Sequence, residues 1–209
     1  MLGALTLIRL DAILELISFF ICAAISAGFI RAHLKLKVGV FLWLGAGFGL
    51  MAGAMLARSL YIILTLTVER GFARPLQPLL QLYSIELFYS IIRVSAYVLF
   101  IVAYLIPLVR ERVELGLGAV PPLLVIYNST FEIISAALLL YVVIVTSVNW
   151  YVRRSAGSSL IAAGFWALIL SHVAFFLTPL SLLLYFLGHG LQLTALILLA
   201  LGTVEAGRG

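Results

Sequence analysis

The chain has 209 residues, 65% of them hydrophobic and only 10% charged, with a formal net charge of +5. A soluble domain usually carries about 25% charged residues, so the composition excludes a water-soluble globular protein, and the apolar content excludes a disordered chain. The basic side chains stand singly or in pairs at the ends of apolar runs, which is typical of membrane loops and argues against nucleic-acid binding. The single cysteine, Cys22, excludes an intramolecular disulfide and a cysteine-rich metal cluster.

The first apolar run covers residues 4–30 and predicts a retained first helix rather than a cleavable signal peptide. Arg9, Asp11 and Glu15 interrupt this run, whereas a signal peptide has an uninterrupted apolar stretch. The run ends at a basic stretch, residues 31–37, whose side chains are expected to lie at the lipid headgroups.

Five further runs are long enough to cross a membrane, because a span needs roughly 20 mostly apolar residues. They cover residues 38–68, 79–109, 122–152, 158–177 and 182–204. Pro179 divides the last two runs and predicts a tight helical hairpin, since proline cannot continue the preceding helix. The sequence therefore predicts an all-α integral membrane protein, a bundle of six transmembrane helices in a single polytopic domain over residues 1–209, without a soluble domain.

Short loops predict that consecutive helices are antiparallel neighbours, which places both termini on one side of the membrane. In that topology five basic residues lie near each side, so the positive-inside rule gives no orientation. No convincing internal repeat is visible in the sequence, so the sequence does not argue for an inverted-repeat transporter.

A stripe of small residues recurs every fourth position in the second run, at Gly45, Gly49, Gly53 and Ala57. Such a stripe lies on one helix face and lets another helix backbone approach closely. Packing within the bundle is the favoured interpretation, and self-association is the alternative.

Ionisable side chains stand inside the apolar runs, where charges are costly and usually have partners. They are Arg9, Asp11, Glu15, Arg58, Glu86, Arg93, Glu132, His172 and His189. Counting the helical rise from one side places Glu15 and Arg93 at roughly 24 Å, and Asp11 and Arg58 at roughly 30 Å with Glu86 a little further. These depths predict two layers of structural ion pairs, with a proton or ion path as the alternative.

The same count places His172, His189 and Glu132 at roughly 11–16 Å, so that they could share one layer near the middle of the bilayer. Gln192 lies on the same helix face as His189. A hydrogen-bonded structural cluster is the favoured interpretation, with a proton or ion site next and a metal or haem site third. We predict no metal site and no cofactor.

Several classes of membrane enzyme lack their residues in this chain. Asp11 is the only aspartate, which excludes a paired-aspartate protease, and no helical pair of histidines or phosphate-binding loop is present. The sequence favours a non-enzymatic multi-pass module of a prokaryotic plasma membrane, acting as a subunit, anchor or sensor element through packing. Its expected partners are the lipid bilayer and a membrane protein or second copy, not nucleic acid. A small proton- or ion-translocating transporter or channel is the alternative.

Overall fold

The computed structural model describes residues 2–68, 77–111 and 128–206, with side chains described over 10–65, 84–105 and 130–206. Those residues form α1 (Leu2–Leu36), α2 (Gly39–Val68), α3 (Gln77–Glu111), α4 (Asn128–Arg153), α5 (Ala156–Phe176), the 3₁₀ turn η1 (Thr178–Leu180) and α6 (Leu182–Ala206). Each of the six α-helices in this part of the chain is long and apolar enough to cross a membrane. The predicted all-α bundle of six membrane helices is confirmed.

The helices extend beyond some of the predicted spans. α1 runs through the basic stretch to Leu36, so Arg31 and Lys35 lie on its last turns rather than in a loop. α4 begins at Asn128, and residues 122–127 of the predicted fourth span lie outside the described residues. The side chain of Arg9 also lies outside them.

Each helix packs against its neighbours in the chain, and α6 closes the ring against α1. Large aromatic side chains fill the centre of this ring. The ring centroids of Phe48 and Phe100 are 4.7 Å apart, and those of Phe100 and Phe165 are 5.9 Å apart. These buried rings connect α2 through α3 to α5, so the core spans the whole bundle.

Helix α4 runs antiparallel to α5. Glu132, near the start of α4, bonds His172, near the end of α5, whereas Ser147, further along α4, accepts a hydrogen bond from the earlier residue Trp166. Moving forward along α4 therefore means moving backward along α5.

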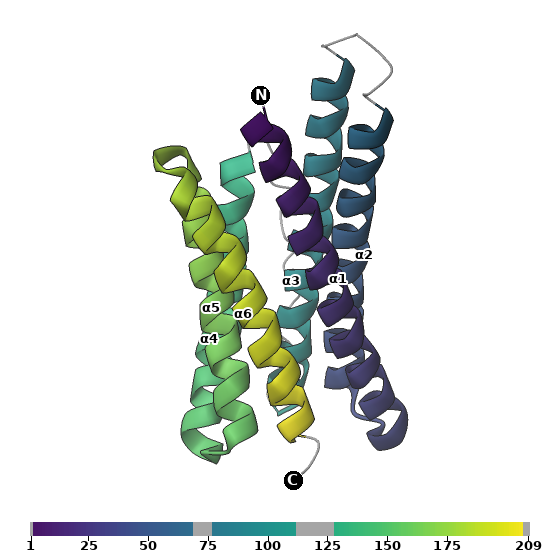
Figure 1. Cartoon of the computed structure of the whole chain (residues 1–209). Coiled ribbons are helices and arrows are strands. Elements are labelled where there is room, and N and C mark those ends of the chain that lie inside the picture. Colours follow the sequence, from purple (N-terminus) through teal and green to yellow (C-terminus); the bar gives the residue numbers. More distant parts are fainter. Residues whose placement is uncertain (1, 69–76, 112–127, 207–209) are drawn as a thin grey trace.

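Helix α3 also runs antiparallel to α5, because Tyr97 contacts His172 and the later residue Tyr104 contacts the earlier residue Phe165. Two helices that are both antiparallel to α5 are parallel to each other. The prediction that all consecutive helices are antiparallel is wrong for α3 and α4, and the prediction that both termini share one side is wrong. Figure 1 shows the termini at opposite ends of the bundle. The antiparallel rule holds for short loops, and the connection over 112–127 is longer than the turns 37–38 and 154–155.

The bundle consists of two three-helix halves that run in the same order of directions. The N-half is α1–α3 and the C-half is α4–α6; Figure 1 shows them side by side. Contacts across the α3/α4 and α1/α6 seams are fewer than contacts between most helix pairs within a half. We call the end with the α1–α2 and α4–α5 turns the turn end, and the opposite end, with η1, the pocket end.

The first turns of the two halves have the same geometry. Lys37 and Arg154 each follow the last residue of a helix in a left-handed conformation, with φ of 56° and 49°. Their amides donate to the carbonyl oxygens of His33 and Trp150, at 2.8 and 2.7 Å. This is the single-bond left-handed helix cap, and in both halves the next helix begins two residues later.

A glycine contact is also repeated. A Cβ on Gly47 of α2 would lie 3.1 Å from the carbonyl oxygen of Ala96 in α3, and against Phe100. A Cβ on Gly164 of α5 would lie 3.1 Å from the carbonyl oxygen of Ala195 in α6, and against Leu199. Gly47 follows Lys37 by the same number of residues as Gly164 follows Arg154. The two halves are thus built on one plan, although the sequence alone did not reveal a repeat.

The predicted small-residue stripe divides between two surroundings. A Cβ on Gly45 or Gly49 would meet α1, at Ile30 and at the Ser26 hydroxyl, which itself donates to the Gly45 carbonyl at 2.7 Å. Gly53 is exposed, and a Cβ there would meet nothing within 4 Å. Ala57 is partly buried. The stripe therefore serves the α1–α2 contact at one end and leaves Gly53 on the outer face.

Valine at Gly47 or Gly164 should destabilise the protein by about 1–3 kcal/mol, because the added atoms overlap packed side chains and a helix backbone. Gly53→Val is the matched control, since it changes the same residue type where the space is open. Thermal unfolding of the detergent-solubilised protein measures the difference. Equal melting temperatures for all three variants would contradict the proposed close approach at Gly47 and Gly164.

Candidate functional site

Arg58 of α2 lies at the pocket end with its side chain 12% exposed, and it pairs with three carboxylates. Its guanidinium group lies 2.9 Å from Asp11, 3.1 Å from Glu15 and 2.7 Å from Glu86, joining α1, α2 and α3. An arginine stays charged at any accessible pH, so burying it requires a counter-charge. Three carboxylates against one guanidinium group leave a formal charge of −2 on these four side chains.

A second arginine, Arg93 of α3, forms a balanced chain of contacts instead. It pairs with Glu132 of α4, whose other oxygen lies 2.6 Å from His172 Nδ1. The Tyr97 hydroxyl lies 2.6 Å from His172 Nε2. With the Nδ1 proton donated to Glu132, Nε2 accepts the Tyr97 proton, so His172 is satisfied as a neutral ring. One positive and one negative charge remain, and they cancel.

Tyr89 of α3 connects the two arginines. Its ring centroid lies 5.3 Å from the Arg58 guanidinium carbon and 5.2 Å from that of Arg93. Its hydroxyl donates to Glu15 at 3.3 Å. A cation over an aromatic face is attracted by the ring quadrupole, so Tyr89 stabilises both guanidinium groups without neutralising either.

His189 of α6 faces the surplus carboxylates across the α1/α6 seam. Its Nε2 lies 3.1 Å from Asp11 Oδ1. Edge contacts with Phe175 and Tyr185, at centroid distances of 4.9 and 4.6 Å, fix the plane of the imidazole ring.

Two carboxylate oxygens in this region lack a hydrogen-bond partner among the described residues. They are Asp11 Oδ1 and Glu15 Oε2, and both are buried. His189 Nε2 therefore lies close to Asp11 Oδ1 without the alignment of a hydrogen bond. Buried acceptors without a donor are rare and need an explanation.

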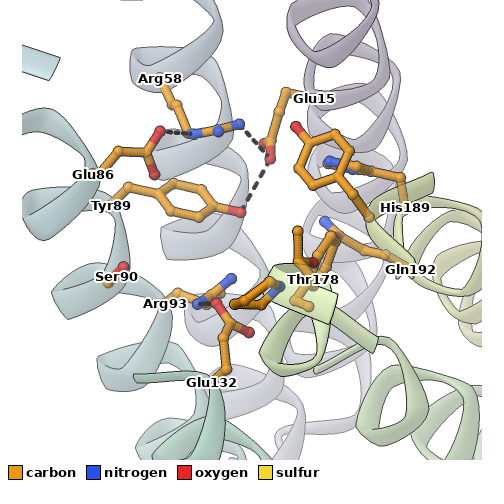
Figure 2. A pocket seen from close by; sticks show the side chains of 13 residues that line it. Glu15, Arg58, Glu86, Tyr89, Ser90, Arg93, Glu132, Thr178, His189 and Gln192 are labelled. Carbon is orange, nitrogen blue, oxygen red and sulfur yellow. Dashed lines mark hydrogen bonds and ion pairs between the residues drawn. The ribbon is translucent and has the colours of Figure 1, made fainter. Parts of the chain in front are cut away.

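A pocket of about 320 Å³ opens between the two halves at this level (Figure 2). Its lining comes from all six helices and η1: Glu15, Arg58, Glu86, Tyr89, Ser90, Arg93, Glu132, Phe175, Thr178, Pro179, Tyr185, His189 and Gln192. Figure 2 shows Glu15 and Arg58 on one side of this space, with Arg93 and Glu132 on another. The pocket thus brings both arginine clusters and His189 to one cavity.

The lining follows the plan of the two halves. Glu15 precedes the Lys37 turn by the same number of residues as Glu132 precedes the Arg154 turn, and both face the pocket. Ala96 of α3 and Ala195 of α6 face the two glycines, and aligning these alanines matches Arg93 with Gln192. The same alignments match three further pairs of lining residues: Arg58 with Phe175, Glu86 with Tyr185, and Ser90 with His189. The pocket therefore lies between equivalent surfaces of the two halves.

The predicted depth groups agree with the observed pairs in part, since Arg58 does pair with Asp11 and Glu86. Glu15 was grouped with Arg93, but it pairs with Arg58, and His189 was grouped with Glu132 and His172, but its charged neighbour is Asp11. Glu132 and His172 do bond each other. Gln192 lines the pocket beside His189. The predicted ionisable residues whose side chains are described all lie at the pocket end, together with two tyrosines, Tyr89 and Tyr97, that the sequence did not single out.

No protein-family model, curated protein sequence or solved structure matches this chain.

Glu132→Gln should destabilise the protein by about 3–5 kcal/mol, because it leaves the buried Arg93 guanidinium group without its carboxylate. Glu15→Gln should stay within about 1 kcal/mol of wild type, since Arg58 keeps Asp11 and Glu86 and the surplus negative charge falls. Both changes replace a carboxylate by an amide of the same shape. Thermal unfolding at neutral pH compares them, and a larger loss for Glu15→Gln would refute the charge assignment.

Proposed function

We propose that this membrane protein binds a small cation in the pocket between its two halves and moves it across the bilayer. The observation that carries the proposal is the excess of carboxylates around Arg58. Glu15 and Glu86 line the pocket, and one oxygen each of Asp11 and Glu15 has no hydrogen-bond partner among the described residues. Buried charge at membrane depth is costly unless it is compensated, so a cation would stabilise this arrangement. An anion or a neutral ligand would leave the surplus in place.

The arrangement of the halves supports movement as well as binding. Transporters built from two repeats hold their substrate between the repeats, and one repeat rocks against the other around that site. Here the N-half and C-half run in the same directions, which corresponds to parallel repeats related by an axis along the membrane normal.

Specific polar contacts cross the seams between the halves. Arg93 pairs with Glu132 between α3 and α4, and His189 lies against Asp11 between α1 and α6. These are the contacts that rocking would break and form again. The ion pairs of Arg58, in contrast, lie within the N-half, so the carboxylate cluster would move as one unit.

The parallel arrangement of the two halves also supports an orientation in the membrane. The described basic residues at the turn end include Arg31, Lys35, Lys37, Arg153 and Arg154, which lie at or beside the α1–α2 and α4–α5 turns. Cytoplasmic loops carry an excess of Lys and Arg, so the turn end is proposed to face the cytoplasm and the pocket end the outside.

We expect the wild-type protein in liposomes on a solid-supported membrane to give a current after a jump in cation concentration. Proton, potassium and divalent manganese jumps cover the main cation classes. Glu15→Gln should reduce the current at least about tenfold. The change removes one carboxylate from the site, and a loss of about 1.4 kcal/mol in cation-binding free energy lowers affinity tenfold. Glu205→Gln is the matched control, since it makes the same change at an exposed position near the end of α6. Properly inserted wild-type protein that gives no current with any of these cations would eliminate transport.

The orientation can be checked with a membrane-impermeant maleimide on intact cells. In a Cys22→Ser background, Leu180→Cys at the pocket end should be labelled directly, because Leu180 is 77% exposed on η1. Val38→Cys in the α1–α2 turn should be labelled only after the membrane is permeabilised. The reverse labelling pattern would place the pocket end in the cytoplasm.

A role through packing with a membrane-protein partner or a second copy is the second candidate. Gly53 favours it, because it is exposed on α2 with open space where a partner helix could approach. Loss of co-purifying protein or of a dimer in Gly53→Val, with the cation current unchanged, would assign this role to that face.

A further inference from the structure

Three potential metal ligands converge beside the pocket, from α1 and α6. Asp11, Glu15 and His189 each offer a ligand atom, and these atoms lie within 4.8 Å of one another. The three residues are 7%, 2% and 5% exposed, so bulk water does not solvate them freely. Neither helix alone could assemble this set, because it depends on the parallel packing of α1 and α6 in the closed ring.

Arg58 satisfies only one oxygen of each carboxylate. Its guanidinium nitrogens bind Asp11 Oδ2 and Glu15 Oε1. The other two oxygens, Asp11 Oδ1 and Glu15 Oε2, have no hydrogen-bond partner in the described part of the chain. Leaving a buried acceptor unsatisfied usually costs about 1–3 kcal/mol, and more for a charged group. A ligand that accepts electron pairs from both oxygens would remove this cost.

His189 is placed to bind the same cation as the two carboxylate oxygens. His189 Nε2 lies 3.1 Å from Asp11 Oδ1, but the pair is not aligned as a hydrogen bond. At this distance both atoms could bind one shared cation after small side-chain rotations. The contacts with Phe175 and Tyr185 hold the ring in place, so the nitrogen is presented in a fixed direction.

We propose that Asp11, Glu15 and His189 bind a divalent transition-metal ion of the first row, with Zn²⁺ and Mn²⁺ as the best matches. One imidazole nitrogen and two carboxylate oxygens suit these ions, whereas Mg²⁺ and Ca²⁺ prefer oxygen ligands alone. Ligands at about 2.0–2.2 Å from an ion lie roughly 3–4 Å from one another, so small side-chain rotations would close the site.

The charge of the cluster matches a dication. Counted as ionised groups, Asp11, Glu15 and Glu86 together with Arg58 have a formal charge of −2, which equals the charge that a divalent ion neutralises. A monovalent cation would leave one negative charge uncompensated in a region of low dielectric.

The geometry fits an exchangeable ion better than a permanent one. Three protein ligands leave at least one coordination position open, and Glu15 and His189 both line the pocket through which that position can be reached. If the proposed transport is correct, this ion is its cargo, so the cargo assignment rests on the proposed function. Binding of the ion at this site does not require transport.

Isothermal titration of the purified full-length protein with ZnCl₂ and with MnCl₂ tests the site. We expect one ion per chain, and MgCl₂ at the same concentrations should give no binding. His189→Gln and Asp11→Asn should weaken binding by at least about 10- to 100-fold, because even residues behind the ligands of a metal site have effects of that size. Glu86→Gln keeps the three ligands and should bind at most about tenfold more weakly. His33→Gln controls for adventitious binding, since His33 lies at the end of α1, beside the exposed α1–α2 turn.

Wild-type protein that binds neither Zn²⁺ nor Mn²⁺ overturns the site. Binding that survives both His189→Gln and Asp11→Asn, or that is lost in His33→Gln, also overturns it and assigns the ion to another surface. Size-exclusion profiles identify a variant that has failed to fold, and such a variant is left out of the comparison. Titration of the wild-type protein alone still shows whether the chain binds Zn²⁺ or Mn²⁺. Metal binding without any cation current keeps the site and rejects transport, whereas a proton or potassium current without metal binding keeps transport and rejects the site.

Discussion

Two guanidinium groups lie inside a bundle that also crosses the membrane, and neither can lose its charge. Arg58 and Arg93 therefore need carboxylates within a few ångströms, and the helices that supply them must meet at the same depth. Arg93 obtains one carboxylate, from α4, and that pair connects the two halves. Arg58 obtains three, from α1 and α3, within one half. The difference between one carboxylate and three gives the pocket its negative charge.

The repeated plan of the halves explains why the pocket has its shape, and the departures from that plan explain its chemistry. Glu15 and Glu132 occupy equivalent positions, but only Glu132 has both an arginine and a histidine as partners. Glu15 shares Arg58 with two other carboxylates and keeps an oxygen without a partner among the described residues. At other equivalent positions Arg58 corresponds to Phe175, and Ser90 to His189. Two similar scaffolds therefore create one asymmetric site rather than two equal ones.

The sequence was sufficient for the six helices and for most of the candidate residues, because length, hydropathy and isolated charges inside apolar runs are properties of the chain alone. It was sufficient for only some of their partners, namely Arg58 with Asp11 and Glu86 and Glu132 with His172. The predicted depths assume that α3 and α4 are antiparallel. This assumption reverses the direction of all three helices of the C-half relative to the N-half. Glu132, His172 and His189 therefore appeared in a layer of their own instead of beside Arg93 and Asp11. A second cause is rotation about the helix axis, because the helical rise fixes how deep a side chain lies and not which neighbour it faces.

The number of carboxylates on Arg58 argues against a purely structural role for the cluster. One carboxylate neutralises a buried guanidinium group, and Glu132 does so for Arg93 in the same bundle. A second and a third carboxylate repel the first and each other, and each must be removed from water. Asp11 and Glu15 are nevertheless 7% and 2% exposed, they lie beside His189, and each keeps one oxygen without a hydrogen-bond partner among the described residues. A fold that needed only to neutralise Arg58 would not require these two carboxylates, whereas the proposed cation site would use both of them.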